Sequence, residues 1–172
     1  MTENTIEARN QGNFPMDDPT QGLLHDHQFV RQLMQRYLAT QDQKVKQYAG
    51  PRICDALLQH TRLEEAVFYP AVQKLDSEMV AQCLDDHHAA DELIEQLQTS
   101  SPGDSTYEAL MKQLQEVITA HIELEEQQLF PLVRKSSLNL HDLALRMQAY
   151  ESTIVSTQAS SSQRSVRGDQ LH

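Results

Sequence analysis

Cysteine is scarce in this chain of 172 residues, which contains only Cys54 and Cys83. Two cysteines cannot build the framework of bridges that holds a small disulfide-rich fold. They also cannot supply the roughly four thiolates of a zinc ribbon or a cysteine-held iron–sulfur cluster. We therefore interpret both cysteines as small core residues.

Long apolar runs are missing as well. No segment approaches the roughly 20 consecutive apolar residues that span a bilayer. Residues 1–19 lack the basic start and the apolar stretch of a signal peptide. The sequence therefore predicts a cytoplasmic protein without a membrane partner.

Positively charged residues are few. The chain has 14 Lys and Arg but 25 Asp and Glu, which gives a formal net charge of −11. Nucleic-acid binding requires clustered positive charge, so we predict no nucleic-acid partner. Anionic lipid surfaces are disfavoured for the same reason. A cationic partner such as a metal ion fits this balance, and the chain has eight histidines to offer one.

The small numbers of turn-forming residues, 5 Gly and 6 Pro, favour long elements with few turns. Apolar residues recur with a helical period in four long segments and one shorter segment. The predicted helices cover approximately residues 21–40, 51–74, 77–97, 105–134 and 140–150. Pro70 and Pro131 are interpreted as helix-end signals. The predicted fold is all-α, an antiparallel up-down four-helix bundle with a short fifth C-terminal helix.

The bundle is predicted to occupy residues 20–151. Residues 1–19 are polar and contain Pro15 and Pro19, which predicts a flexible N-terminal arm. Residues 152–172 are rich in Ser, Thr and Gln without an apolar period, which predicts a disordered tail.

An internal duplication divides the bundle at an offset of 60 to 61 residues. One repeated motif is His-x-x-Leu-Glu-Glu followed by an aromatic residue and proline, and it begins at His60 and at His121. The other is Leu-x-Asp-His, which begins at Leu24 and at Leu84. Each half therefore supplies one helix with a lone inward histidine and one helix with His-x-x-x-Glu.

The repeated motif predicts a metal centre. Residues four apart on a helix differ by about 40° in direction, so each His-x-x-x-Glu pair points one way, onto the apolar face. Buried glutamates facing neutral imidazoles are costly unless a cation compensates them. Two cations fit best, because a glutamate can bridge them while each histidine holds one. The candidate ligands are His27, His60, Glu64, His87, His121 and Glu125.

Several neighbours of these ligands have open roles. Asp91 follows His87 by four residues and so shares its helix face. It is a possible ligand, an acceptor for an imidazole N–H, or a surface charge. Tyr48, just before the second helix, can reach the site as a phenol or serve in packing. Glu65 and Glu126 lie five residues after their histidines, about 140° away, and are predicted to be surface charges.

The donor types narrow the choice of metal. Mixed imidazole and carboxylate ligands suit iron, zinc or manganese, and the lack of thiolates disfavours a structural zinc site. Two metals that share carboxylates in a helical bundle are typical of di-iron proteins, although ferritin-like members use Glu-x-x-His instead. Six protein donors leave positions for water, an oxo group, O₂ or peroxide.

Together these motifs resemble the hemerythrin family, in particular the bacterial hemerythrin-like HHE cation-binding proteins, over residues 20–135. The resemblance implies two iron ions in an oxo- and carboxylate-bridged centre, held by the same six ligands, with O₂, peroxide or NO as partners. The O₂-carrying members have a second histidine where this chain has Asp91. Their last carboxylate is an aspartate five residues after its histidine, whereas Glu125 here follows at four. These departures move the expectation from simple O₂ carriage toward redox chemistry.

Three hypotheses of function follow. The first is a hemerythrin-like non-haem di-iron protein that binds O₂ or responds to O₂ or redox state. The second is a di-iron enzyme that decomposes peroxide, as a catalase does, or acts in nitric-oxide or iron stress. In the third, the metal only holds the bundle and the tail binds a partner. The sequence identifies no catalytic residue and leaves open whether the protein is an enzyme.

Overall fold

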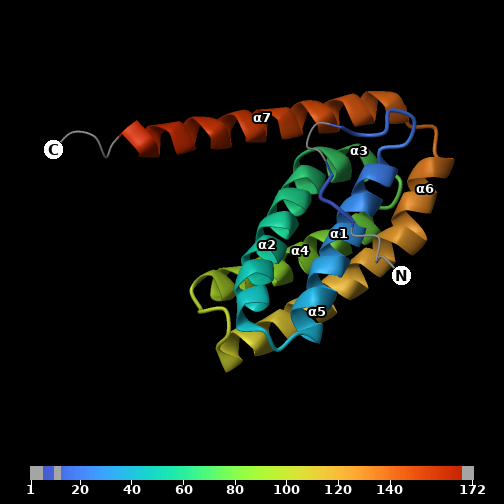
Figure 1. Ribbon diagram of the computed structural model, residues 1–172. Helices are drawn as coiled ribbons and strands as arrows, with labels where there is room; N and C mark the ends of the chain where they lie inside the picture. Colours follow the sequence, from blue (N-terminus) through green and yellow to red (C-terminus); the bar gives the residue numbers. More distant parts are fainter. Residues whose placement is uncertain (1–5, 10–12, 168–172) are drawn as a thin grey trace.

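The computed structural model describes residues 6–9 and 13–167, and side chains as far as Ile154. In this part of the chain every regular element is helical, so the predicted all-α class is confirmed (Figure 1). None of these helices combines the length and the apolar character that crossing a membrane requires. The elements are α1 (Thr20–Ala39), α2 (Gln43–Leu63), η1 (Glu64–Phe68), α3 (Tyr69–Val72), α4 (Ser77–Gln98), α5 (Ser105–Leu124), η2 (Glu125–Leu129), α6 (Phe130–Lys135) and α7 (Leu140–Arg167).

The four long helices pack as two hairpins, α1 along α2 and α4 along α5. Aspartate side chains cap the N-termini of α2 and α4. The side chain of Asp42 accepts a hydrogen bond from the N–H of Lys44 at 2.9 Å, and Asp76 accepts one from Met79 at 2.9 Å. Each cap satisfies a backbone N–H that the first helical turn leaves unpaired.

Helix α2 begins at Gln43, whereas the sequence predicts its start near Pro51, which lies inside the helix. Contacts with the rest of the protein fix the additional turns. Lys46 is buried and forms an ion pair with a glutamate of α5. Gly50 lies directly against Tyr107, whose hydroxyl would be 2.5 Å from a Cβ at this glycine. These contacts are tertiary, so the local sequence does not reveal them.

Each hairpin contains one π-helical turn, η1 after α2 and η2 after α5, at equivalent places in the duplication. The N–H of Tyr69 bonds to the carbonyl of Glu64, and the N–H of Phe130 bonds to that of Glu125. Both bonds span five residues instead of four. A proline follows each aromatic residue, and its missing N–H and bulky ring oppose a regular α turn. The helix therefore widens and continues through the proline, and it ends a few residues later, close to residues 74 and 134, where the sequence predicts the helix ends.

Apolar side chains form two clusters, and a polar layer separates them. One cluster contains Tyr37 and Ile53, and the other contains Phe68 and Met147. Each long helix passes from one cluster to the other, and in α1 His27 lies at this crossing point. The polar layer is therefore enclosed on two sides by apolar surface, where electrostatic interactions are strong.

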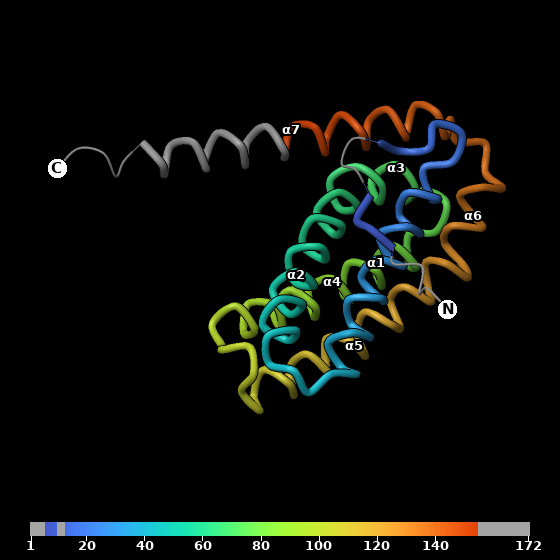
Figure 2. Tube along the Cα trace, viewed as in Figure 1, coloured from blue at the N-terminus to red at the C-terminus, as the bar shows by residue number. Residues whose placement is uncertain are grey.

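Helix α7 lies across the end of the hairpins nearest α3 (Figure 2). Its first turns bury Leu143, Ala144 and Met147. The helix continues to Arg167, beyond residue 152, where the sequence predicts a disordered tail. Residues 152–167 contain neither proline nor glycine, and an established helix gains one hydrogen bond with each residue it adds. Residues 168–172 of the predicted tail lie outside the described residues.

Part of the predicted flexible arm packs against α1. Phe14 is only 2% exposed, and its ring would lie 2.5 Å from a Cβ at Gly22. The guanidinium of Arg9 lies 3.8 Å from the centre of the Phe14 ring. Within residues 6–9 and 13–19, the arm is therefore anchored through an aromatic side chain. Residues 1–5 and 10–12 lie outside the described residues.

Candidate metal centre

The structure brings the six predicted ligands together in the polar layer between the hairpins. All six are buried, and even His60, the most exposed of them, is only 6% accessible. In each hairpin a histidine near the end of a long helix and a glutamate in the following π turn lie side by side. The ligands are His27 on α1, His60 at the end of α2, Glu64 in η1, His87 on α4, His121 in α5 and Glu125 in η2.

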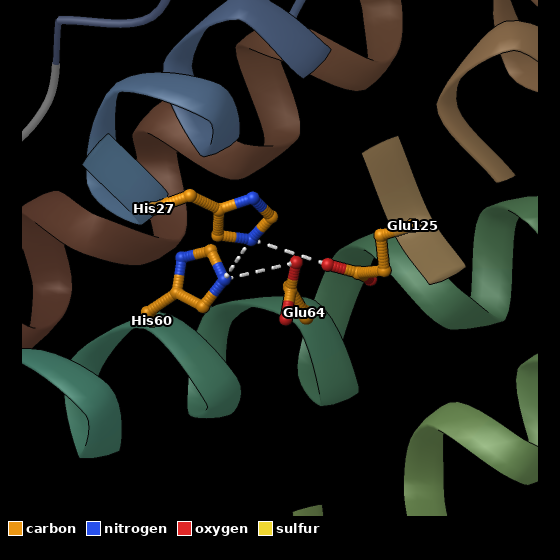
Figure 3. A group of neighbouring side chains, drawn as sticks. All are labelled: His27, His60, Glu64 and Glu125. Atoms are coloured by element: carbon orange, nitrogen blue, oxygen red, sulfur yellow. Dashed lines mark hydrogen bonds and ion pairs between the residues drawn. The ribbon is translucent and has the colours of Figure 1, made fainter. Parts of the chain in front are cut away.

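One group of donors, called the first position, contains His27, His60, Glu64 and Glu125 (Figure 3). The Nε2 atoms of the two histidines are 3.1 Å apart. Oε1 of Glu64 lies 3.2 Å from Nε2 of His60, and Oε2 of Glu125 lies 3.2 Å from Nε2 of His27. All four side chains thus point their donor atoms toward one another.

The other group, called the second position, contains Glu64, His87 and His121. Here the two Nε2 atoms are 3.2 Å apart, and Oε2 of Glu64 lies 3.3 Å from Nε2 of His87. Oε2 of Glu125 lies 3.4 Å from Nε2 of His121. Each glutamate therefore lies between a histidine of the first position and a histidine of the second, as a bridging carboxylate would.

The donor set fits cations. Oε1 of Glu64 and Oε2 of Glu125 are buried and accept no hydrogen bond of regular geometry among the described residues, although each lies 3.2 Å from the Nε2 of a histidine. Such oxygens are rare in folded proteins, and a metal ion satisfies them. The donor atoms within each group all lie within 4.8 Å of one another. This spread is compatible with bonds of about 2 Å from each donor to a shared ion.

Two glutamates that the sequence predicts as surface charges contact the outer nitrogens of the histidines. Oε1 of Glu65 lies 2.8 Å from Nδ1 of His87, and Oε1 of Glu126 lies 3.0 Å from Nδ1 of His27. The prediction considered only their direction on their own helix, whereas both side chains reach across to the other hairpin. A carboxylate at Nδ1 fixes the tautomer of the imidazole and turns its Nε2 toward the metal position.

At the other two histidines, His60 and His121, an aspartate lies near the outer nitrogen, Nδ1. Oδ2 of Asp26 lies 3.5 Å from Nδ1 of His60, and Oδ2 of Asp86 lies 3.6 Å from Nδ1 of His121. In the sequence these aspartates are visible only as markers of the duplication. Their position directly before a histidine in both halves was the signal that could have identified them.

The buried charges shift one another's pKa. Burial acts to raise the pKa of Glu125, but His121 and His27 outweigh it and hold that pKa well below its ordinary value. Burial acts to lower the pKa of His60, but Glu64 and a neighbouring aspartate raise it to about 10. The pKa of His121 is also raised, against burial, chiefly by Glu125. Protons on these histidines thus balance the carboxylates, and a cation must displace them to bind.

Tyr69 is the residue in this layer that the sequence analysis missed. Its hydroxyl donates a hydrogen bond to Oε1 of Glu125 at 2.8 Å and lies 3.2 Å from Nε2 of His87. Oε2 of Glu64 is 3.4 Å away. Burial and the two glutamates raise the pKa of the phenol well above its ordinary value, so it stays protonated without a metal.

The aromatic residues make the two positions unequal. Tyr69 corresponds to Phe130 in the duplication, and Phe130 has no hydroxyl. The ring of Phe130 stacks on His27, with centroids 5.6 Å apart and an angle of 11° between the planes. The second position therefore has a phenol oxygen beside it, whereas the first has an apolar ring.

Tyr48 does not reach this layer, so the first of the two roles considered for it, a phenol at the site, does not hold in the structure. It is 60% exposed, and the guanidinium of Arg52 lies 4.9 Å from its ring. It precedes His60 by 12 residues on the same helix, which corresponds to about 18 Å along the axis.

Asp91 belongs to neither group of donors. It is half-buried, and its Oδ1 has no hydrogen-bond partner among the described residues. Burial, and then the nearby charge of Glu65, raise the pKa of its carboxyl. Asp91 therefore neighbours an outer carboxylate of the site. His25 and His88 also lie outside both groups.

Comparisons with known proteins show a family and a shared fold. A family model described as Hemerythrin HHE cation binding domain matches residues 18–133. The chain is also similar to a curated DNA nickase of Nostoc sp., with 30% identity over 152 residues. That match covers 86% of this chain and 43% of the nickase, so the chain spans less than half the length of this relative.

A solved structure shares the fold. The crystal structure of a hemerythrin HHE cation binding domain-containing protein from Mycobacterium kansasii superimposes with a TM-score of 0.63. The alignment covers 76% of this chain and 83% of the other, at 19% sequence identity. At that identity, the likeness establishes a common fold.

Proposed function

The chain belongs to the hemerythrin HHE cation-binding family, and on that premise we propose that it is a non-haem di-iron protein that binds O₂ or responds to O₂ or redox state. The proposal takes the four long helices as an antiparallel up-down bundle with two iron ions in its polar layer. The observation that carries it is the placement of Glu64 and Glu125, each between two histidine pairs.

The charges and the donors support two iron ions. Glu64 and Glu125 bring two negative charges into a buried layer, and imidazoles that bind a metal are neutral. Imidazole with carboxylate is a donor set that iron accepts, and paired metals with shared carboxylates in a bundle are typically iron. When bound, the two ions supply redox chemistry and coordination positions that the protein donors leave open.

The protein's own contribution is to hold and orient the donors and to exclude water. Glu65 and Glu126 keep Nε2 of His87 and Nε2 of His27 turned inward. Phe68 and Phe130 are fully buried and cover the layer on the side of α3 and α6. A dry layer of this kind strengthens every electrostatic interaction within it.

A second candidate function, a di-iron enzyme that decomposes peroxide or acts in nitric-oxide or iron stress, is favoured by Tyr69. This residue holds a neutral O–H inside the centre, at 2.8 Å from Glu125. Cleavage of an O–O bond requires a proton for the departing oxygen, and a positioned side chain can deliver it. Sustained oxygen evolution from peroxide would favour this function over O₂ binding or sensing.

We do not transfer the activity of the nickase to this chain. The relative is more than twice as long as the matched region, and a formal net charge of −11 opposes binding to a phosphate backbone.

The direct test is to purify the protein from iron-supplemented cells and to measure iron per chain together with the absorption spectrum. We expect about two irons per chain and a ferric absorption band in the near ultraviolet. The variant His88→Ala is the matched control and retains both. One zinc per chain without such a band would overturn the di-iron proposal.

A further inference from the structure

The N-terminal arm forms a partly buried ion network with two helices. The guanidinium of Arg9 contacts both carboxylate oxygens of Asp26 on α1, at 3.1 Å from Nε and 2.9 Å from Nη2. It also contacts both oxygens of Glu151 on α7, at 3.0 Å from Nη1 and 2.6 Å from Nη2. The side chains of Arg9 and Glu151 are each only 9% exposed. Bidentate contacts of this kind between a guanidinium and a carboxylate fix the orientation of the carboxylate.

This network reaches only one of the two equivalent histidines on α2 and α5, namely His60. Asp26, which Arg9 holds, lies 3.5 Å from Nδ1 of His60. In the other half of the duplication, Asp86 lies 3.6 Å from Nδ1 of His121, but its polar partner is the amide of Gln82 at 2.9 Å. Of the two equivalent aspartates, Asp26 is therefore held by the guanidinium of Arg9, whereas Asp86 is held by a neutral amide.

A cavity of about 750 Å³ borders this network, and its lining includes Arg9, Asp26, His60 and Glu151. Water in the cavity would compete for the Asp26 carboxylate if Arg9 did not hold it. Without the guanidinium, Asp26 and Glu151 would also be left as two neighbouring negative charges without their shared partner. Both effects would turn Asp26 away from His60.

We propose that Arg9 is a positioning residue that holds Asp26 against His60 and thereby raises the affinity of the first position for its cation. The inference rests on the proposed metal centre. Contacts to the outer nitrogen of a ligating histidine typically change metal affinity by about 10- to 100-fold. We therefore expect a loss of about tenfold or more at the first position when Arg9 is removed, and no change at the second.

The test is a titration of the metal-stripped full chain with Co²⁺, followed by visible absorption. Wild type should bind two ions. Arg9→Ala should bind one ion as wild type does and the other about tenfold or more weakly. Arg9→Lys should recover only part of the loss, because an ammonium cannot contact two oxygens of each carboxylate in a fixed fork. Arg146→Ala, which breaks an exposed ion pair on α7, is the matched control and should bind as wild type.

Backgrounds with one position disabled show where the loss occurs. In His87→Ala, which retains the first position, adding Arg9→Lys should weaken the remaining Co²⁺ site. In His27→Ala, which retains the second position, the same change should have no effect. Circular dichroism of each metal-free variant identifies any that fail to fold. If a double variant does not fold, the difference in Co²⁺ affinity between Arg9→Lys and wild type tests the role of Arg9.

The outcomes separate the two proposals. If wild type binds no Co²⁺, the metal centre itself is wrong and this inference fails with it. If wild type binds two ions and the Arg9 variants bind them equally well, the centre stands and the role of Arg9 is wrong. An equal loss at both positions would also overturn it, because that result indicates general destabilisation.

Discussion

Nδ1 of His27 lies 3.0 Å from Oε1 of Glu126, although 99 residues separate them in the sequence. His87 and Glu65 repeat this relationship in the opposite direction, at 2.8 Å. Each hairpin therefore orients a histidine that belongs to the other. The duplication has produced two halves that complete each other's site, which explains why the centre lies between them.

This exchange predicts the effect of Glu126→Ala. Removing the carboxylate releases the ring of His27, and the affinity for metal should fall by about 10- to 100-fold. The measurement is competition for Fe²⁺ or Co²⁺ against a chelator of known affinity. Glu123→Ala, which removes an exposed glutamate near the end of α5, is the control and should bind normally. Equal losses in both variants would show that the contact with His27 does not matter.

Loss of a ligand should cost metal and stability together. His60→Ala removes the imidazole beside Oε1 of the buried Glu64, and breaking such a buried pair typically costs about 3–5 kcal/mol of unfolding free energy. His121→Ala should act in the same way on Glu125. Denaturant unfolding and metal analysis measure both effects. The exposed His88 is the control, and His88→Ala should change neither; a reversed result would place the site on the wrong face of α4.

The pH dependence of the metal-free protein follows from the shifted pKa values. The pKa of His60 is raised from 6.5 to about 10, so its contribution to stability is complete below about pH 6.5 and is lost as the pH rises toward 10. The pKa of Glu125 is lowered from 4.5, so its contribution is present above about pH 4.5 and is lost in acid. These two groups give greatest stability between about pH 5 and 6.5.

Denaturant unfolding of the metal-stripped protein across this range tests the prediction. The loaded protein should not show the alkaline decline, because the cation takes the place of the protons. Metal affinity should rise over the same interval in which the metal-free protein loses stability. An apo protein that is equally stable at pH 6 and pH 10 would contradict the assignment of the proton to His60.

Tyr69→Phe tests whether the phenol donates a proton. The variant keeps the ring that packs beside His87, so the protein should still bind two irons. Peroxide decomposition should fall by about 100-fold, a typical contribution of a general acid. Tyr48→Phe, far from the centre, is the control. An unchanged rate in Tyr69→Phe would remove the main support for the enzymatic alternative.

The helices and the six clustered residues could be predicted from the sequence because both depend on simple periodicity. His60 and Glu64 lie four apart on an apolar face, and the duplication supplies the second pair. Any packing that buries those faces must bring the repeated motifs together. The all-α class followed from the same periodicity.

Tyr69 could not be placed in this way, because the π turn changes its direction. In a regular α-helix it would lie about 140° from Glu64, five residues earlier, and so on another face. The wider turn absorbs one residue and brings the two side chains together, with Tyr69 Oη 3.4 Å from Glu64 Oε2. The contact of Glu65 with His87 depends in turn on how the hairpins face each other, which local spacing does not encode.

The central claim is that two iron ions lie between the hairpins, and anomalous X-ray diffraction at the iron edge of the loaded protein tests it most directly. The account predicts two anomalous peaks, one between His27 and His60 and one between His87 and His121, each within bonding distance of both Glu64 and Glu125. A single peak, or iron bound elsewhere on the chain, would contradict it.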